Sequence, residues 1–190
     1  IFFLQERIGK DGKKFELFKF ATMLKNSPDI GTGTVTMKND PRVLPLGRFL
    51  RKTKINELPQ LLNIFFGDMS VIGPRPLTSQ AFETYSDNTK CLIKKVRPGL
   101  SGIGSIVFRA EEEILHGAIG SIDFYKNVIA PYKGELEEWF VSNKSLYIYF
   151  VAIFVTAWAV LIPSTKIVWR VFKDLPKPPN DLKQALNFID

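Results

Sequence analysis

The stretch that decides the fold is residues 51–76, RKTKINELPQLLNIFFGDMSVIGPRP. Apolar residues in it recur at i, i+3, i+4 and i+7, which predicts a short helix with one buried face. That face would consist of Leu58, Leu61, Leu62 and Phe65. Asn56 is a suitable N-cap for this helix, Pro59 is tolerated in its first turn, and Gly67 would end it.

The polar pair Asn56-Glu57 stands at the start of this helix, with basic residues on both sides of it. These basic residues are Arg48, Arg51, Lys52 and Lys54 before the pair and Arg75 after it. A helix N-terminus offers unpaired N–H groups and the positive end of the helix dipole to an anion. Together with a carboxylate and several arginines, this arrangement predicts phosphate chemistry.

The composition of the whole chain narrows the class of partner. With 190 residues, 45% of them hydrophobic, and a net charge of +7, we expect one domain with its own core and anionic partners. No recognition helix, zinc motif or aromatic RNA-binding motif accompanies the charge, so we expect no nucleic-acid partner. The single cysteine, Cys91, excludes an internal disulfide and indicates a reducing compartment.

The N-terminal part of the chain predicts a β-hairpin over residues 2–23, because two aromatic-rich runs flank the turn signal at residues 9–12. Residues 24–41 lack periodicity and are rich in turn-forming residues, so we expect a loop there. Residues 42–52 predict a short basic amphipathic helix that leads into the central stretch.

A second Gly-rich and basic segment covers residues 96–109, VRPGLSGIGSIVFR. It contains three glycines: Gly99, Gly102 and Gly104. Such glycines allow backbone N–H groups to approach a ligand closely. A plain surface loop is the alternative, and the glycines alone favour it. Arg97 and Arg109, at the two ends of the segment, favour a phosphate site.

The segments on either side of this one predict helices over residues 78–95 and mixed helical structure over residues 110–143. The glutamate run at 111–113 is typical of a solvated helix face. His116 is the only histidine, and it has no partners at the spacing of metal ligands, so we expect a structural residue.

The most apolar segment is residues 146–162, LYIYFVAIFVTAWAVLI, which contains no charged residue and is followed by Pro163. Its length lies at the lower end of the roughly 17–25 residues of a membrane span. A core helix is the alternative, but it would need apolar partners on all sides. We therefore expect a helix in or on the bilayer, followed by a peripheral tail at residues 176–190.

Three blocks of the chain resemble the bacterial sugar transferase family in the family's own order. The blocks are FFLQERIGKDGKKFELFKFATM, DPRVLPLGRFLRKTKINELPQLLNIFFGDMSVIGPRP and VRPGLSGIGS, and SNKSLYIYFVAIFVTAWAVL is similar to the family's C-terminal helix. The family comprises monotopic phosphoglycosyl transferases, which begin exopolysaccharide, lipopolysaccharide O-antigen and glycoprotein glycan assembly. The resemblance covers residues 1–163.

What the resemblance implies is transfer of a hexose-1-phosphate from a UDP-sugar to polyprenyl phosphate, with Mg²⁺ as cofactor and UMP as product. The reaction would take place at the cytoplasmic face of the bacterial inner membrane. The resemblance is also compatible with a homodimer.

Family members carry an Asp-Glu dyad where this chain has Asn56-Glu57, and the resemblance assigns this pair to catalysis. In the family the Asp attacks the substrate phosphate and the Glu assists with metal or protons, whereas a neutral amide is a very poor nucleophile. Three hypotheses remain open. In the first, Glu57 acts as nucleophile or base in place of the Asp, and in the second, Asn56 is an engineered substitution that blocks catalysis. In the third, the protein is an inactive membrane-bound protein that binds substrate or a partner. The segment GIGSIVFR also departs from the family's GWAQVNGR, which favours a natural subfamily.

The resemblance assigns phosphate binding to one lysine and four arginines: Lys19, Arg51, Arg75, Arg97 and Arg109. Arginine suits this task because its planar guanidinium contacts phosphate oxygens in pairs. Glu57 would also serve the metal. Glu137 matches an acidic position of the family and would support the metal or an arginine.

We therefore predict an α+β fold, a mostly helical single domain with an N-terminal β-hairpin and membrane-associated helices. The transferase domain would span residues 1–175, without the re-entrant membrane helix that the family carries upstream of the hairpin.

Overall fold

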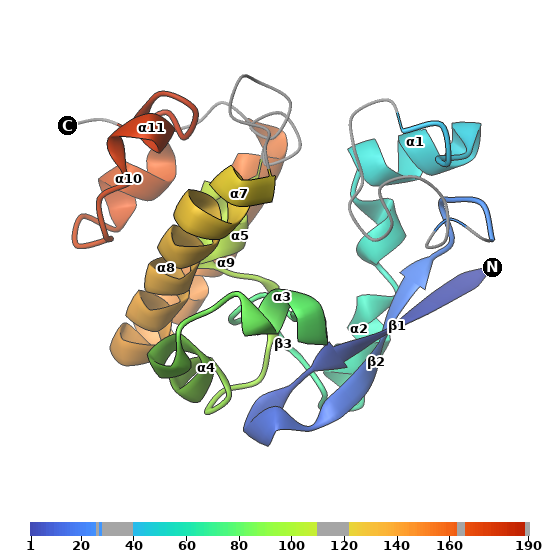
Figure 1. Cartoon of the computed structure of the whole chain (residues 1–190), viewed down its shortest axis with the longest axis horizontal. Coiled ribbons are helices and arrows are strands. Elements are labelled where there is room, and N and C mark those ends of the chain that lie inside the picture. Colours follow the sequence, from blue (N-terminus) through green and yellow to red (C-terminus); the bar gives the residue numbers. More distant parts are fainter. Residues whose placement is uncertain (26, 28–39, 110–121, 163–165, 189–190) are drawn as a thin grey trace.

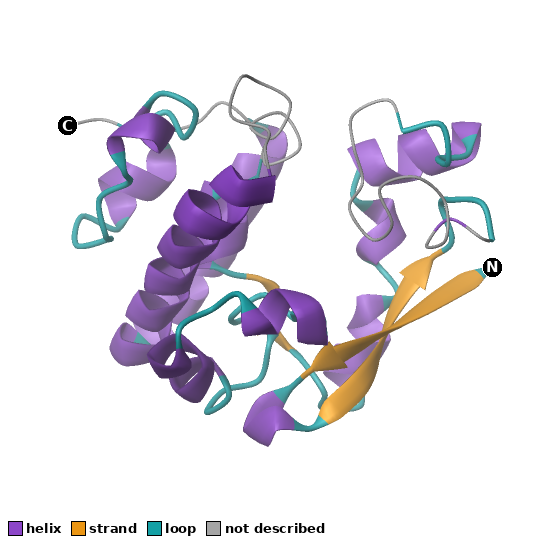
Figure 2. Ribbon diagram, in the orientation of Figure 1, coloured by secondary structure: helices purple, strands orange, loops and turns teal. Residues whose placement is uncertain are grey.

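The structure is a computed structural model, and it describes residues 1–25, 27, 40–109, 122–162 and 166–188. It confirms a mixed α+β architecture that is mostly helical (Figures 1 and 2). The N-terminal hairpin pairs β1 (Phe2–Ile8) with β2 (Lys14–Phe20) in antiparallel register. Its turn passes through Asp11 and Gly12 at positive φ, a conformation that glycine adopts without strain and that aspartate tolerates.

After the hairpin, the chain forms the basic helix α1 (Pro45–Lys52), a 3-10 turn at Ile55–Glu57 and the short helix α2 (Gln60–Phe65). Most of the predicted loop at 24–41 lies outside the described residues. Gly67 ends α2 at a φ of 85°, as the sequence predicts. Asn56 lies inside the 3-10 turn and Pro59 is the N-cap of α2, so the predicted N-cap is wrong.

The predicted buried face of α2 is also wrong. Its apolar residues are exposed to solvent: Leu58 at 51%, Leu61 at 51%, Leu62 at 42% and Phe65 at 83%. The helix instead buries its polar side, with Gln60 and Asn63, against the hairpin. Asn63 Oδ1 accepts the Phe18 N–H, and Asn63 Nδ2 donates to the Glu16 carbonyl. The amide thus satisfies backbone groups of β2 that an apolar side chain would leave unpaired.

The Gly-rich segment is not a surface loop. It forms β4 (Gly99–Ser101), which pairs in parallel with β3 (Ser70–Ile72). Its glycines let two backbones approach each other: a Cβ on Gly99 would lie 2.1 Å from the Gly73 nitrogen, and one on Gly102 would lie 2.1 Å from the Gly73 oxygen. Close contact between these two segments therefore explains both glycines.

Two short helices, α3 (Ser79–Glu83) and α4 (Asp87–Ile93), lie within residues 78–95, which the sequence predicts to be helical. The break between them comes at Ser86, whose side chain accepts the Thr89 N–H and so caps α4.

The C-terminal half consists of helices around the main hydrophobic core. They are α5 (Ile103–Val107), α7 (Ile122–Phe124), a π-helical turn at Tyr125–Ile129, α8 (Ala130–Asn143), α9 (Leu146–Leu161), α10 (Ile167–Val171) and α11 (Asn180–Lys183). The glutamate run at 111–113 and His116 lie outside the described residues. Figure 1 shows α8 and α9 on the other side of the molecule from α1, α2 and the hairpin.

The apolar helix α9 is buried on one side only. Ala152, Val155 and Ala159 face the core at i, i+3 and i+7, whereas Phe154 and Trp158 are exposed. In the described part of the chain, no helix combines the length and the apolar character needed to cross a membrane. The C-terminal tail is not peripheral as expected, because Leu182 and Leu186 are buried in the same core.

Candidate active site

A small polar hollow lies where the hairpin, the 3-10 turn at Ile55–Glu57, α2, β4 and the segment after β3 meet. The hollow is lined by Arg7, Leu17, Lys19, Glu57, Gln60, Arg75, Pro76 and Leu100. Its lining combines three cations with one carboxylate, a set of charges that suits the charged part of a larger substrate, such as a diphosphate.

Strand alternation explains why the hairpin contributes several residues to the hollow. Phe3 pairs with Lys19, and Arg7 pairs with Phe15, so Arg7 and Lys19 lie on the same face of the hairpin. Arg7 is a site residue that the sequence analysis missed. Because a two-residue alternation places it on the face of Lys19, the hairpin register is the signal that could have found it.

Glu57 is the only carboxylate among the residues that line this hollow. Burial alone would raise its pKa, but neighbouring positive charges lower the pKa below its usual value. The cations that do so are Arg75, Lys19, Lys54 and Arg51. Glu57 is therefore ionised at neutral pH, as both a nucleophile and a metal ligand must be.

The pKa of Lys19 is also lowered, but here burial and the neighbouring cations act in the same direction. Burial lowers its pKa to about 7, the positive charges of Arg75 and Arg7 act in the same direction, and only Glu57 opposes them. Arg7 shows the same pattern, since burial and Arg75 lower its pKa to about 10. These cations thus outnumber the single carboxylate that lies among them. A site of this kind gains electrostatic free energy when a phosphate binds to it.

Asn56 lies next to Glu57 in the sequence but is not among the residues lining the hollow. Its side chain is buried, and its Oδ1 has no hydrogen-bond partner among the described residues. Of the two residues of the predicted catalytic pair, Glu57 is thus the one that the fold presents to the hollow.

The fold brings only some of the predicted phosphate-binding arginines to the hollow. Arg75 lines the hollow, and Arg51, in the last turn of α1, is close enough for its charge to lower the pKa of Glu57. Arg97 lies close to Gly67, and Arg109 follows α5. Neither of these two residues is among those that line the hollow.

Glu137 is buried in α8, and its Oε1 accepts the backbone N–H of Arg75 at 3.3 Å. Burial raises its pKa to about 7, against the opposing effects of this hydrogen bond and of the charges of Lys133 and Arg75. Of the two roles the sequence suggested for Glu137, support of an arginine matches this contact.

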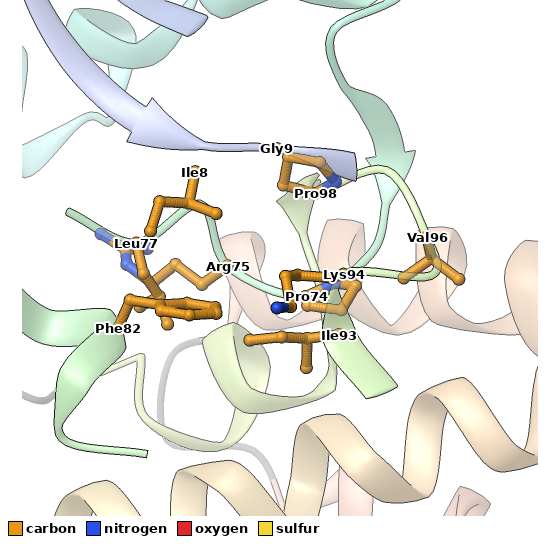
Figure 3. A pocket seen from close by; sticks show the side chains of 10 residues that line it. All are labelled: Ile8, Gly9, Pro74, Arg75, Leu77, Phe82, Ile93, Lys94, Val96 and Pro98. Atoms are coloured by element: carbon orange, nitrogen blue, oxygen red, sulfur yellow. The ribbon is translucent and has the colours of Figure 1, made fainter. Parts of the chain in front are cut away.

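A second hollow also has Arg75 in its lining (Figure 3). Its walls are mainly apolar and include Ile8, Leu77, Phe82 and Ile93, with Lys94 as a second basic residue. Figure 3 shows Arg75 among these side chains, and Arg75 also lines the first hollow, so the two hollows share this residue.

The residues that the structure describes contain no group of three His, Cys, Asp or Glu side chains able to hold a metal ion. Mg²⁺, however, binds through one or two carboxylates, with substrate phosphates and water completing its shell. Glu57 can supply one such carboxylate, so the site fits a Mg²⁺ ion that arrives with a phosphorylated substrate.

In this hollow an ionised carboxylate lies among three cations, Arg7, Lys19 and Arg75, a set of charges suited to a phosphate group. The family model "Bacterial sugar transferase" matches residues 1–163. The chain therefore belongs to the bacterial sugar transferase family.

Several curated relatives are similar to this chain. The undecaprenyl-phosphate galactose phosphotransferase of Salmonella typhimurium is 32% identical over 82% of this chain and 32% of its own length. The UDP-glucose:undecaprenyl-phosphate glucose-1-phosphate transferase of Klebsiella pneumoniae is 41% identical over 56% of this chain and 23% of its own length. The exopolysaccharide production protein ExoY of Rhizobium meliloti is 38% identical over 56% of this chain and 53% of its own length. The chain spans about a third of the length of the first of these relatives.

Proposed function

We propose that this chain is the catalytic unit of a membrane-associated transferase that moves a sugar-1-phosphate from a UDP-sugar to polyprenyl phosphate. UMP is the second product, and the reaction begins the assembly of an exopolysaccharide or a related glycan. The observation that carries the proposal is the ionised Glu57 among Lys19, Arg75 and Arg7 in one hollow. The names of the relatives, which are sugar phosphotransferases acting on undecaprenyl phosphate, support the same reaction.

Glu57 acts as the nucleophile in this proposal. Its carboxylate attacks the β-phosphorus of the UDP-sugar, and the bond from that phosphorus to the bridging oxygen breaks, so UMP leaves with this oxygen. The sugar-1-phosphate stays on Glu57 as an acyl phosphate. An oxygen of polyprenyl phosphate then attacks the same phosphorus and restores the carboxylate. Asn56 takes no part because the hollow excludes it.

The cations supply the electrostatic part of catalysis. Arg75 and Lys19 bind the diphosphate oxygens and stabilise the negative charge that develops on them as UMP leaves. Mg²⁺ bound to Glu57 and the diphosphate would neutralise further charge at the same point.

Membrane association rests on exposed apolar side chains close to basic ones. Phe2 and Phe3 on β1, Phe49 on α1, and Phe65 and Phe66 on α2 are all exposed. Helix α1 also carries three basic residues: Arg48, Arg51 and Lys52. Apolar side chains beside basic ones suit an anionic lipid surface, which agrees with a lipid substrate and with the cytoplasmic face of the inner membrane.

The test is UMP release from UDP-galactose and UDP-glucose with polyprenyl phosphate and Mg²⁺. It compares this sequence with three variants: Glu57→Gln, Asn56→Asp and the control Glu16→Gln. Glu16 is exposed on β2 of the hairpin and does not line the hollow. We expect turnover by this sequence and by Glu16→Gln, and none by Glu57→Gln. Turnover by Asn56→Asp alone would overturn the assignment of the chemistry to Glu57.

A separate measurement tests the covalent step. A nucleophile that holds the sugar phosphate allows labelled UMP to exchange into the UDP-sugar without any polyprenyl phosphate. We expect this exchange in the unchanged sequence and in Glu16→Gln, but not in Glu57→Gln. Turnover without exchange would show that Glu57 acts as a base.

A further inference from the structure

The segment Pro74-Arg75-Pro76 has a single backbone N–H group, because proline nitrogens carry no hydrogen. This N–H belongs to Arg75, and it donates to Oε1 of Glu137 at 3.3 Å. The following proline also restricts Arg75 to extended backbone conformations. The contact with Glu137 is thus the one hydrogen bond through which the backbone nitrogens of this segment can be held.

The carbonyl groups on either side of Arg75 are fixed as well. Pro74 O accepts the Gly99 N–H at 2.8 Å, and Pro76 O accepts Nη1 of Arg7 at 3.0 Å. The backbone that carries Arg75 therefore has one anchor on β4, one on β1 and one on α8. Only the anchor on α8 is an ionisable side chain buried outside the hollow.

Glu137 occupies a costly position for a carboxyl group. It is 2% exposed, and its Oε2 has no hydrogen-bond partner among the described residues. An enclosed carboxyl with an unsatisfied oxygen lowers the stability of the fold. A role for it beyond packing is therefore expected, and its one described acceptor contact points to Arg75.

Gly104 provides the space that this carboxyl group occupies. A Cβ at Gly104 would lie 2.5 Å from Oε1 of Glu137 and 3.2 Å from its carboxyl carbon. Gly104 lies inside α5 without a positive φ, so glycine is needed here for space and not for its backbone conformation. Any larger residue would push Oε1, the atom that holds Arg75, out of its place.

We propose that Glu137 and Gly104 form a size-matched pair that positions Arg75 against the diphosphate of the sugar nucleotide. Glu137 is a positioning residue, since it contacts the Arg75 backbone and does not line the hollow. The inference rests on the proposed function, in which Arg75 binds the diphosphate.

The first experiment measures hydrogen exchange of the Arg75 amide by NMR, with no ligand present. In this sequence and in Glu137→Gln, whose amide oxygen still accepts the bond, we expect slow exchange. In Gly104→Ala and Glu137→Asp, which displace or shorten the acceptor, exchange should be roughly tenfold faster. The control Glu135→Asp changes an exposed glutamate of the same helix and should leave the exchange unaltered. Equal exchange rates in all five proteins would overturn the proposal that Glu137 and Gly104 position Arg75.

The second experiment measures the affinity for UDP by calorimetry, because all UDP-sugars share this part. Gly104→Ala should weaken binding about tenfold, whereas Glu137→Gln should stay within about threefold of the unchanged sequence. In an Arg75→Ala background, Gly104→Ala should cause no further loss, since the residue it displaces no longer has a guanidinium to position. Equal losses in both backgrounds would overturn the positioning role and leave Glu137 a packing residue.

These two measurements separate the inference from the proposed function. A protected Arg75 amide together with no UDP binding by the unchanged sequence would count against the transferase alone. Should Gly104→Ala fail to fold, Glu137→Asp, which adds no atom to the core, tests the same contact.

Discussion

Arg7 of β1 donates from Nη1 to the carbonyl oxygen of Pro76 at 3.0 Å, so one residue both lines the hollow and ties the hairpin to the segment that carries Arg75. We predict that Arg7→Ala weakens UDP binding roughly tenfold or more, because a charge and a backbone anchor are lost together. Arg7→Lys restores the charge without the forked donor and should recover only part of the affinity.

The matched control for Arg7 is Lys14→Ala, a loss of positive charge at an exposed position of the same hairpin. Its affinity for UDP should be unchanged in isothermal calorimetry. An equal loss in both variants would mean that only the net charge of the hairpin matters.

The amide of Asn63 makes a prediction for stability. It is fully buried and pairs with both the Phe18 N–H and the Glu16 carbonyl of β2. Asn63→Ala leaves these two backbone groups unsatisfied, so we expect a loss of about 2–4 kcal/mol in the free energy of unfolding. Asn127→Ala, at an exposed position, should change it by less than about 0.5 kcal/mol. Urea unfolding of both variants decides the point, and a small loss for Asn63→Ala would show that α2 does not depend on this contact.

Asn63 also shows what sequence patterns can predict about this fold and what they cannot. Periodicity correctly places Leu61, Leu62 and Phe65 on one side of α2, but a pattern does not say what that side contacts. Here the side is exposed, because the polar face of the helix satisfies backbone groups of the hairpin. The hairpin itself was predictable, since its turn and its alternation are local signals.

Some residues of the candidate site could likewise be predicted from the sequence, and others could not. Lys19, Glu57 and Arg75 could be proposed from motifs, because each belongs to a block that resembles the family. Arg7 could not, because its place in the hollow depends on the register of the hairpin. The contact between Gly104 and Glu137 joins α5 to α8 and has no local signature in the sequence.

Lys19 predicts a pH dependence of binding. Burial lowers its pKa to about 7, so the free site loses this positive charge as the pH rises above that value. The affinity for UDP should therefore fall between about pH 7 and pH 9. Lys19→Arg keeps a charge over the whole range and should remove most of this decline. Calorimetric titrations at several pH values give the comparison, and parallel profiles for the two proteins would exclude Lys19 as the cause.

Glu137 predicts a pH dependence of stability. Burial raises its pKa from 4.5 to about 7 in the folded protein, so the folded state holds a proton that the unfolded state releases. Its contribution to stability is complete below about pH 4.5 and is lost as the pH rises through about 7, by up to about 3 kcal/mol. Glu137→Gln cannot ionise and should lack this decline. Thermal unfolding of both proteins from pH 5 to pH 8 tests this prediction. Equal changes of stability with pH in the two proteins would show that the pKa of Glu137 is not raised.

The exposed aromatic residues of α2 predict membrane binding. Phe65 and Phe66 are 83% and 64% exposed, and their rings contact each other, so they form one apolar projection. Burying a phenylalanine contributes about 1.5–3 kcal/mol, so Phe65→Gln should weaken binding to phosphatidylglycerol vesicles about tenfold. The control Gln80→Ala alters an exposed side chain of α3 and should bind as the unchanged sequence does. Vesicle co-sedimentation measures both variants, and equal binding would place the lipid contact on another surface, such as the exposed side of α9.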